Sequence, residues 1–179
     1  MRKTAIAVVV ASSALLLVLA SPAAACPGAS FGLDRQSTQQ AQSAITCLIK
    51  KQRKKHHVRA IRSNPHLTQA AVTHSSQMAA SNFFGHTGPD GTPQSRAAAT
   101  GYMAGAHAWG VGENIGWGVG RAGSPRAIVR GWMRSAGHRA VMLDGRFRQV
   151  GVGVVGGAPA PGNDRGAATV TALFGYRKG

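Results

Sequence analysis

The chain contains a single glutamate, Glu113, in a stretch that is rich in glycine and poor in acids. Because a solubilising charge would be an unusual choice there, we consider Glu113 a candidate for chemistry. A carboxylate and neutral imidazoles can together hold Zn²⁺ or another divalent cation and leave positions open for water or a ligand. A carboxylate can also orient a histidine by accepting a hydrogen bond from its ring. The chain supplies seven histidines, although a histidine taken alone is more often structural than a ligand.

Basic residues form a second candidate site. Lys and Arg number 21 against 5 Asp and Glu, which gives a net charge of +16 at pH 7. The densest cluster, in residues 50–59, includes Lys50, Lys51, Arg53, Lys54 and Lys55. Such a cluster can indicate nucleic-acid binding, but the interleaved aromatic residues of a single-strand binder do not accompany it. We expect no nucleic acid as partner, since anionic cell-envelope polymers or lipid suit an exported protein better. A merely solvated helix end is the alternative interpretation.

Residues 1–25 have the pattern of a removable export signal. Arg2 and Lys3 precede an apolar run over residues 5–20, and small residues lead up to Cys26. The run is shorter than the roughly 20 apolar residues of a spanning helix, and no later segment is long and apolar enough to cross a bilayer. We therefore expect a secreted, extracellular protein, with envelope association left open. An uncleaved anchor and lipidation of Cys26 are the alternatives, although Ala23 stands where a lipidation motif usually has Leu, Val or Ile.

The chain has two cysteines, Cys26 and Cys47. Export would expose them to an oxidising compartment, where their only intramolecular pairing is with each other. A disulfide would attach the N-terminal tail, residues 26–36, to the first helix. A lipidated Cys26 with a free Cys47, or two free thiols, are the alternatives.

The remaining pattern predicts one α+β domain over residues 37–179. Apolar spacing and capping residues predict helices over residues 38–57, 67–82, 93–99 and 124–137. Alternating or continuous apolar runs predict strands over residues 149–155 and 169–176. Seven glycines predict that residues 105–123 are irregular or only briefly extended. Helices first and strands last favour a layered domain with an antiparallel sheet.

Three short motifs follow one another in a recognisable order. They are FFGHT at residues 83–87 followed by Asp90-Gly91, GENI at residues 112–115, and WMRSAGHR at residues 132–139. This series resembles the CAP superfamily of cysteine-rich secretory proteins, antigen 5 and plant pathogenesis-related proteins, in its compact bacterial SCP-like form. The resemblance covers residues 38–175 and implies a three-layer α–β–α sandwich with a small, mainly antiparallel central sheet.

The resemblance also implies a site. In the family two histidines and a glutamate face one cleft, and the matching positions here are His86, Glu113 and His138. His86 and His138 would be the metal ligands, for Zn or another divalent cation. Larger members carry a further glutamate on the helix before the later histidine, but residues 126–137 contain no acid here. The closeness of Ser135 to His138 in sequence does not by itself establish a nucleophile–base pair.

These observations together predict a binding module rather than a fast enzyme. The expected partner is lipid or an anionic envelope polymer, and the cleft would hold a divalent metal. The alternative is a metal-assisted, peptidase-like hydrolase in which Glu113 acts as the base. We expect His74 at the edge of the core rather than as a ligand, and the three tryptophans, Trp109, Trp117 and Trp132, in the core.

Overall fold

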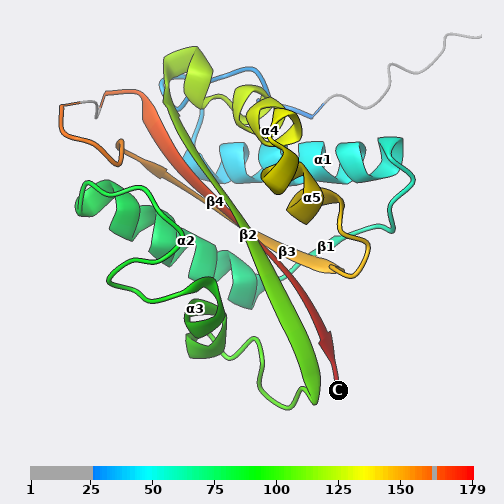
Figure 1. Cartoon of the computed structure of the whole chain (residues 1–179). Helices are drawn as coiled ribbons and strands as arrows, with labels where there is room; N and C mark the ends of the chain where they lie inside the picture. Colours follow the sequence, from blue (N-terminus) through cyan, green and yellow to red (C-terminus); the bar gives the residue numbers. More distant parts are fainter. Residues whose placement is uncertain (1–25, 163–164) are drawn as a thin grey trace, which may run out of the picture.

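A four-stranded sheet forms the centre of the molecule (Figure 1). The computed structural model describes residues 26–162 and 165–179, so the predicted signal peptide lies outside the described residues. The sheet order is β1-β3-β4-β2. Strand β1 pairs with β3 in parallel, whereas β3 and β2 each pair with β4 in antiparallel orientation. The strands are β1 (Arg62–Ser63), β2 (Ala108–Val119), β3 (Gln149–Gly156) and β4 (Ala167–Lys178).

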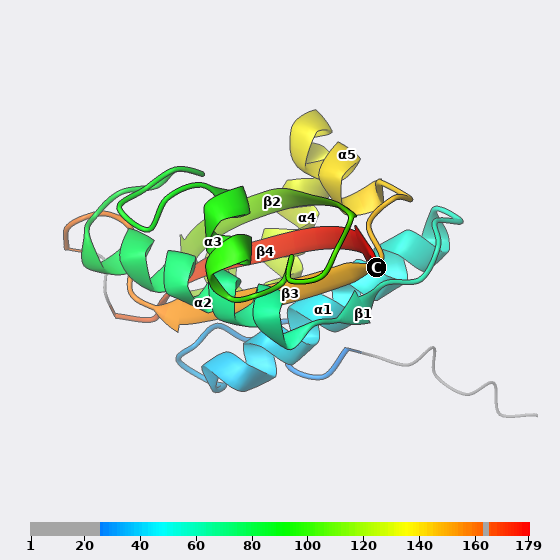
Figure 2. The same ribbon diagram turned by 90° about the horizontal axis from the view of Figure 1, so that it is seen from below.

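Helices cover both faces of this sheet (Figures 1 and 2). One face carries α1 (Thr38–Lys55), α4 (Pro125–Arg134) and α5 (Ala136–Leu143), and the other carries α2 (Pro65–Ala80) and α3 (Pro93–Ala99). A short 3₁₀ helix, η1 (Gly120–Gly123), joins β2 to α4. The expected α–β–α sandwich with a small, mainly antiparallel sheet is confirmed.

The alternation of valine and glycine along β3 is explained by what packs on each face of the strand. Val150, Val152 and Val154 are buried in the larger core cluster, which α1 and α4 complete. The glycines face the other way, against α2. A Cβ on Gly151 would lie 2.0 Å from the backbone of Leu67, so only glycine lets α2 approach the sheet this closely.

Our expectation for residues 105–123 was wrong, because this segment contains the twelve-residue strand β2. Tertiary pairing overrides its glycine content, since β2 is paired with β4 along its whole length, from Ala108 opposite Lys178 to Val119 opposite Ala167. The glycines make room for neighbouring side chains: a Cβ on Gly112 would lie 2.8 Å from the Phe147 ring.

The helix expected over residues 124–137 is also different in detail. Helix α4 ends at Arg134, and a separate helix, α5, begins at Ala136. Gly137 therefore lies inside α5 instead of ending a helix, and His138 is held on that helix. Of the three tryptophans only Trp132 is in the core, because Trp109 and Trp117 on β2 are exposed.

Two further features lie at the margins of the sheet. The predicted disulfide between Cys26 and Cys47 is present, so the N-terminal segment is attached to α1. Strand β1 reaches only as far as Val150 on β3, so the outer edge of β3 from Gly151 onward has no partner strand among the described residues. Within residues 26–162 and 165–179, no helix is long and apolar enough to cross a membrane.

Candidate functional site

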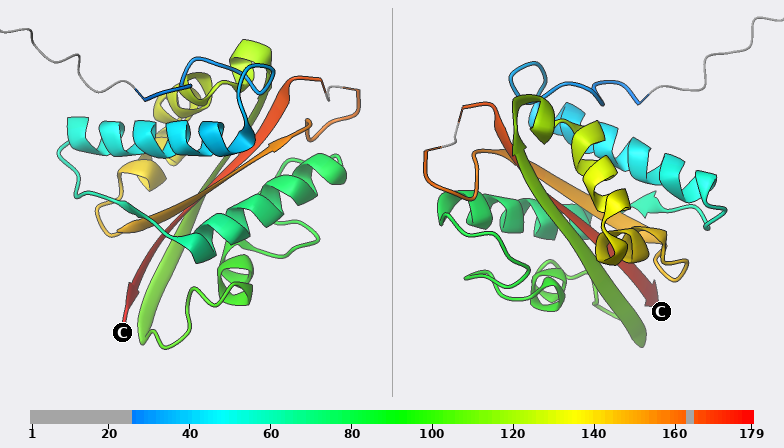
Figure 3. Two further views of the ribbon diagram at one scale, coloured as in Figure 1. Left: turned by 180° about the vertical axis from the view of Figure 1, so that it is seen from behind. Right: turned by 45° about the horizontal axis from the view of Figure 1, so that its top comes forward.

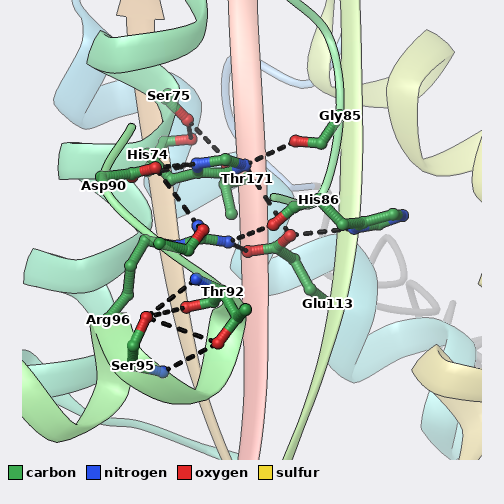
Figure 4. Close-up of polar contacts among 12 residues, drawn as sticks. His74, Ser75, Gly85, His86, Asp90, Thr92, Ser95, Arg96, Glu113 and Thr171 are labelled. Atoms are coloured by element: carbon green, nitrogen blue, oxygen red, sulfur yellow. Dashed lines mark hydrogen bonds and ion pairs between the residues drawn. The ribbon is translucent and has the colours of Figure 1, made fainter. Parts of the chain in front are cut away.

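Glu113 and His86 are in direct contact (Figure 4). Glu113 lies on β2 with its side chain 1% exposed, and His86 lies on the loop between α2 and α3 with its side chain 52% exposed. The Nδ1 of His86 is 2.9 Å from Glu113 Oε1. The carboxylate therefore accepts a hydrogen bond from Nδ1–H, and the lone pair of this ring is left on the opposite nitrogen, Nε2.

The other oxygen of Glu113 accepts a hydrogen bond from Arg96. This arginine lies on α3, is buried, and places Nη2 at 2.7 Å from Glu113 Oε2. It also donates to the carbonyl oxygens of His86 and Gly91, at 2.9 and 2.7 Å. Arg96 thus fixes both the carboxylate and the loop that carries His86. Sequence reasoning missed Arg96. The only signal for it was its position six residues after Asp90, which lies in the loop of the first motif.

His74 and Asp90 complete the buried cluster. The Nδ1 of His74 lies 3.0 Å from Asp90 Oδ2, and its Nε2 lies 2.9 Å from the Gly85 carbonyl oxygen. Both ring nitrogens thus face hydrogen-bond acceptors, a carboxylate on one side and a backbone carbonyl on the other. Asp90 is also paired with Arg96, at 3.3 Å. His74 is fully buried and holds the loop in place, which agrees with a structural role rather than a ligand role.

His138 lies on α5, and its backbone is attached to the strand that carries Glu113. The side chain of Asn114, next to Glu113, donates to the His138 carbonyl oxygen at 3.0 Å. Burial lowers the pKa of His138, and the charge of His86 lowers it further. His138 is therefore more readily neutral than an ordinary histidine, which is the form that ligates metals.

The described residues form no ready-made cluster of metal ligands around Glu113. No group of three His, Cys, Asp or Glu side chains in residues 26–162 and 165–179 is arranged to hold a metal ion. Both oxygens of Glu113 are engaged by protein donors. Glu113 thus orients the ring of His86 and is not free to act as a ligand itself.

The basic cluster divides into one structural residue and several surface residues. Arg53 is completely buried and cannot contact an external surface, so its predicted role in anionic binding was wrong. Its guanidinium donates to the carbonyl oxygens of Arg59, Met142, Asp144 and Phe147 at 2.9–3.0 Å. Burial lowers the pKa of this arginine, and the charge of Arg148 adds to the effect.

The lysines of the cluster remain on the surface. Lys50, Lys51 and Lys54 line a groove of about 710 Å³ between α1 and the edge of β3. Val150 and Val152 also line it, together with polar side chains of α1 such as Gln42 and Thr46. Lys55 is exposed but does not line this groove. We call this feature the lysine groove.

The fold is an α–β–α sandwich, and comparisons with known proteins place it in a family. The profile described as "Cysteine-rich secretory protein family" matches residues 48–169. Because this match spans more than half of the chain, the protein belongs to the CAP family. Among curated proteins, none matches the sequence.

Three solved structures of similar fold are bacterial proteins. An outer surface protein from Borrelia burgdorferi has a TM-score of 0.65 at 17% identity, covering 80% of this chain and 97% of that one. An extracellular SCP-domain protein from Bacillus anthracis has a TM-score of 0.57 at 25% identity, covering 76% and 39%. A cysteine-rich secretory protein from Staphylococcus aureus has a TM-score of 0.55 at 15% identity, covering 78% and 40%. The chain thus spans about two fifths of the latter two.

Proposed function

We propose that this protein is a secreted binding module that attaches to anionic envelope polymers or lipid headgroups through the lysine groove. The observation that carries the proposal is the alignment of Lys50, Lys51 and Lys54 along one groove. No acid among the described residues lines this groove, so the three charges are free to attract an anionic chain. Val150 and Val152 also line the groove but are only 1% and 3% exposed, so the lysines would make most of the contacts with a bound polymer or lipid.

Replacing the three groove lysines by glutamine tests this function. A lysine near an anionic surface contributes about 1 kcal/mol, so the triple variant should bind on the order of 100-fold more weakly. Binding of the parent to anionic vesicles or wall polymer, measured by cosedimentation, should fall steeply with added salt, because screening acts over about 8 Å at physiological ionic strength. Arg53 is left intact because its removal would break buried hydrogen bonds.

The matched control removes three exposed charges elsewhere: Arg134, Arg165 and Lys178, each to glutamine. This variant has the same net charge as the groove variant and should bind nearly as well as the parent. Equal losses in both variants would mean that only total charge matters, and undiminished binding by the groove variant would reject the proposal.

A second candidate function is weak, exchangeable binding of a divalent cation by His86 and His138. The specific observation in its favour is the hydrogen bond from His86 to Glu113, which leaves Nε2 of a half-exposed ring available. When bound, the ion would supply Lewis acidity or a bridge to an anionic ligand. For the hydrolase alternative, Glu113 would have to act as a base, yet both its oxygens are hydrogen-bonded in a buried position. This arrangement favours the binding module.

Titration calorimetry with Zn²⁺ tests the cation site. His86→Ala and His138→Ala should each abolish binding, because at most one of the two imidazoles remains. Glu113→Gln should only weaken it, since the carboxylate orients rather than ligates. Affinity in the parent should decrease as the pH falls through about 6, because ligation requires neutral imidazole. The exposed His107→Ala is the control, and parent-like affinity in both histidine variants would exclude the site.

A further inference from the structure

Three arginines border a small hollow at the beginning of α4. Arg126 and Arg130 lie one turn apart on that helix, and Arg121 reaches the same hollow from η1. Ser30, Ser124 and Ala127 complete the lining of a space of about 230 Å³. All three arginines are exposed. The arginine hollow shares no lining residue with the lysine groove.

Nothing in the described chain neutralises these arginines. Each of the four acids it contains is already paired: Asp34 with Arg35, Asp90 and Glu113 with Arg96, and Asp144 with Arg146. Like charges four residues apart on a helix repel one another. The arrangement of Arg126 and Arg130 therefore works against the stability of α4, which suggests that an external anion compensates it.

The N-terminal segment forms one wall of the hollow and is held firmly there. Figure 3 shows this segment running beside η1 and α4. The backbone N–H of Arg126 donates to the Ala29 carbonyl oxygen at 2.8 Å, and its Nε donates to Ser30 Oγ at 3.1 Å. The Cys26–Cys47 disulfide attaches the same segment to α1. Because Ser30 occupies Nε, the two terminal nitrogens of Arg126 stay available for a ligand.

We infer that this hollow binds the phosphate group of a phosphate monoester. The planar fork of arginine matches the oxygens of phosphate bidentately. A monoester carries a charge of about −1.5 to −2 at pH 7, so it compensates three arginines better than a diester or a carboxylate. A space of about 230 Å³ has room for one phosphate group with bound water.

An adjoining hollow provides room for the remainder of the ester. It has a volume of about 440 Å³, shares Ser30 and Arg121 with the arginine hollow, and includes Phe31, which is 47% exposed. Asp34, which also borders it, has Arg35 as its counter-ion at 3.7 Å. A soluble phosphate ester and the headgroup of a phosphomonoester lipid share this chemistry, so the experiment must distinguish them.

The test uses the exported protein with its disulfide intact, and compares Arg126→Gln/Arg130→Gln with a control, Arg62→Gln/Arg134→Gln. Inorganic phosphate is titrated at constant ionic strength and followed by ³¹P NMR. Vesicles containing phosphatidic acid, a monoester, are compared with vesicles containing phosphatidylglycerol, a diester. The hollow variant should lose at least tenfold in affinity for the monoester probes, and the control should stay within twofold of the parent.

The outcomes separate the ligand sources and the two proposals. Binding of inorganic phosphate alone indicates a soluble ester, and binding of phosphatidic acid vesicles indicates a lipid headgroup; either supports the site if the hollow variant loses it. The lysine-groove variant should keep its affinity for inorganic phosphate, so failure of one proposal does not imply failure of the other. Equal losses in the hollow and control variants, or no binding of either monoester probe, would overturn the inference.

Discussion

At the scale of single residues, Glu113 connects the molecular surface to the buried interior. Its Oε1 accepts from the half-exposed His86, and its Oε2 accepts from the buried Arg96. Arg96 is in turn shared with Asp90, which also binds His74. Two carboxylates thus face one arginine and one histidine in a region of low dielectric, where an unpaired member would be costly.

Replacing Arg96 by methionine should therefore destabilise the fold strongly. The substitution leaves Asp90 and Glu113 without their arginine while both remain buried, and breaking a buried ion pair typically costs about 3–5 kcal/mol. Urea denaturation measures the loss. Arg134→Met, an exposed arginine that contacts no acid among the described residues, is the control and should change the free energy of unfolding by less than about 0.5 kcal/mol. A difference of less than about 1 kcal/mol between the two variants would show that the cluster is not a stabilising unit.

Sequence motifs pointed to His86, Glu113 and His138 but not to Arg96, and the reason is physical. Short motifs marked the first three, whereas Arg96 and Arg53 resemble any other basic residue in a chain with 21 of them. Only the packing distinguishes an arginine that binds buried carbonyl oxygens from one that lies in solvent. For the same reason the sequence could not show that Arg53 stands apart from its neighbouring lysines.

At the scale of elements, the segment from Cys26 to the beginning of α1 acts as a strap across two helices. The disulfide fixes it to α1, and the hydrogen bond from Arg126 to Ala29 fixes it to α4. The cysteines are 21 residues apart in sequence, and closing a loop of that size removes entropy from the unfolded chain.

Replacing both cysteines by serine should lower the free energy of unfolding by about 3 kcal/mol. It should also weaken phosphate binding at the arginine hollow, because Ser30 would no longer be held beside Arg126. Zinc binding at His86 and His138 should be unaffected, since none of their partners belongs to the strap. Denaturation and the two titrations on the same variant check these expectations, and a simultaneous loss of zinc binding would indicate global unfolding instead.

Local sequence pattern predicted some helices and strands well and others poorly. The helices over residues 38–55 and 93–99 were predictable because capping residues and apolar spacing agree there. Strand β2 was not, since its glycines signal a loop locally and become favourable only beside β4 and the rings packed on them. Pairing between segments distant in sequence decided that case.

At the scale of the whole molecule, the surface is more one-sided in charge than the composition suggests. Of the few acids, Asp90 and Glu113 are inside the fold, where each side chain is at most 7% exposed. The basic residues are distributed over several faces, including the lysine groove and the arginine hollow. The sequence predicted a basic, layered domain correctly, because net charge follows from composition and the layers follow from the order of helices and strands. The sequence could not predict that basic side chains line two separate features, the lysine groove and the arginine hollow.

The short strand β1 has a consequence for how copies of this chain meet. Beyond Val150 the outer edge of β3 has no partner strand among the described residues, and open strand edges are templates for pairing between molecules. Lys50, Lys51 and Lys54 line the groove beside that edge, and lysines at strand edges discourage such pairing by mutual repulsion. If a polyanion binds these lysines as proposed, the same charges would also oppose self-association of the protein, and neutralising them would remove that opposition.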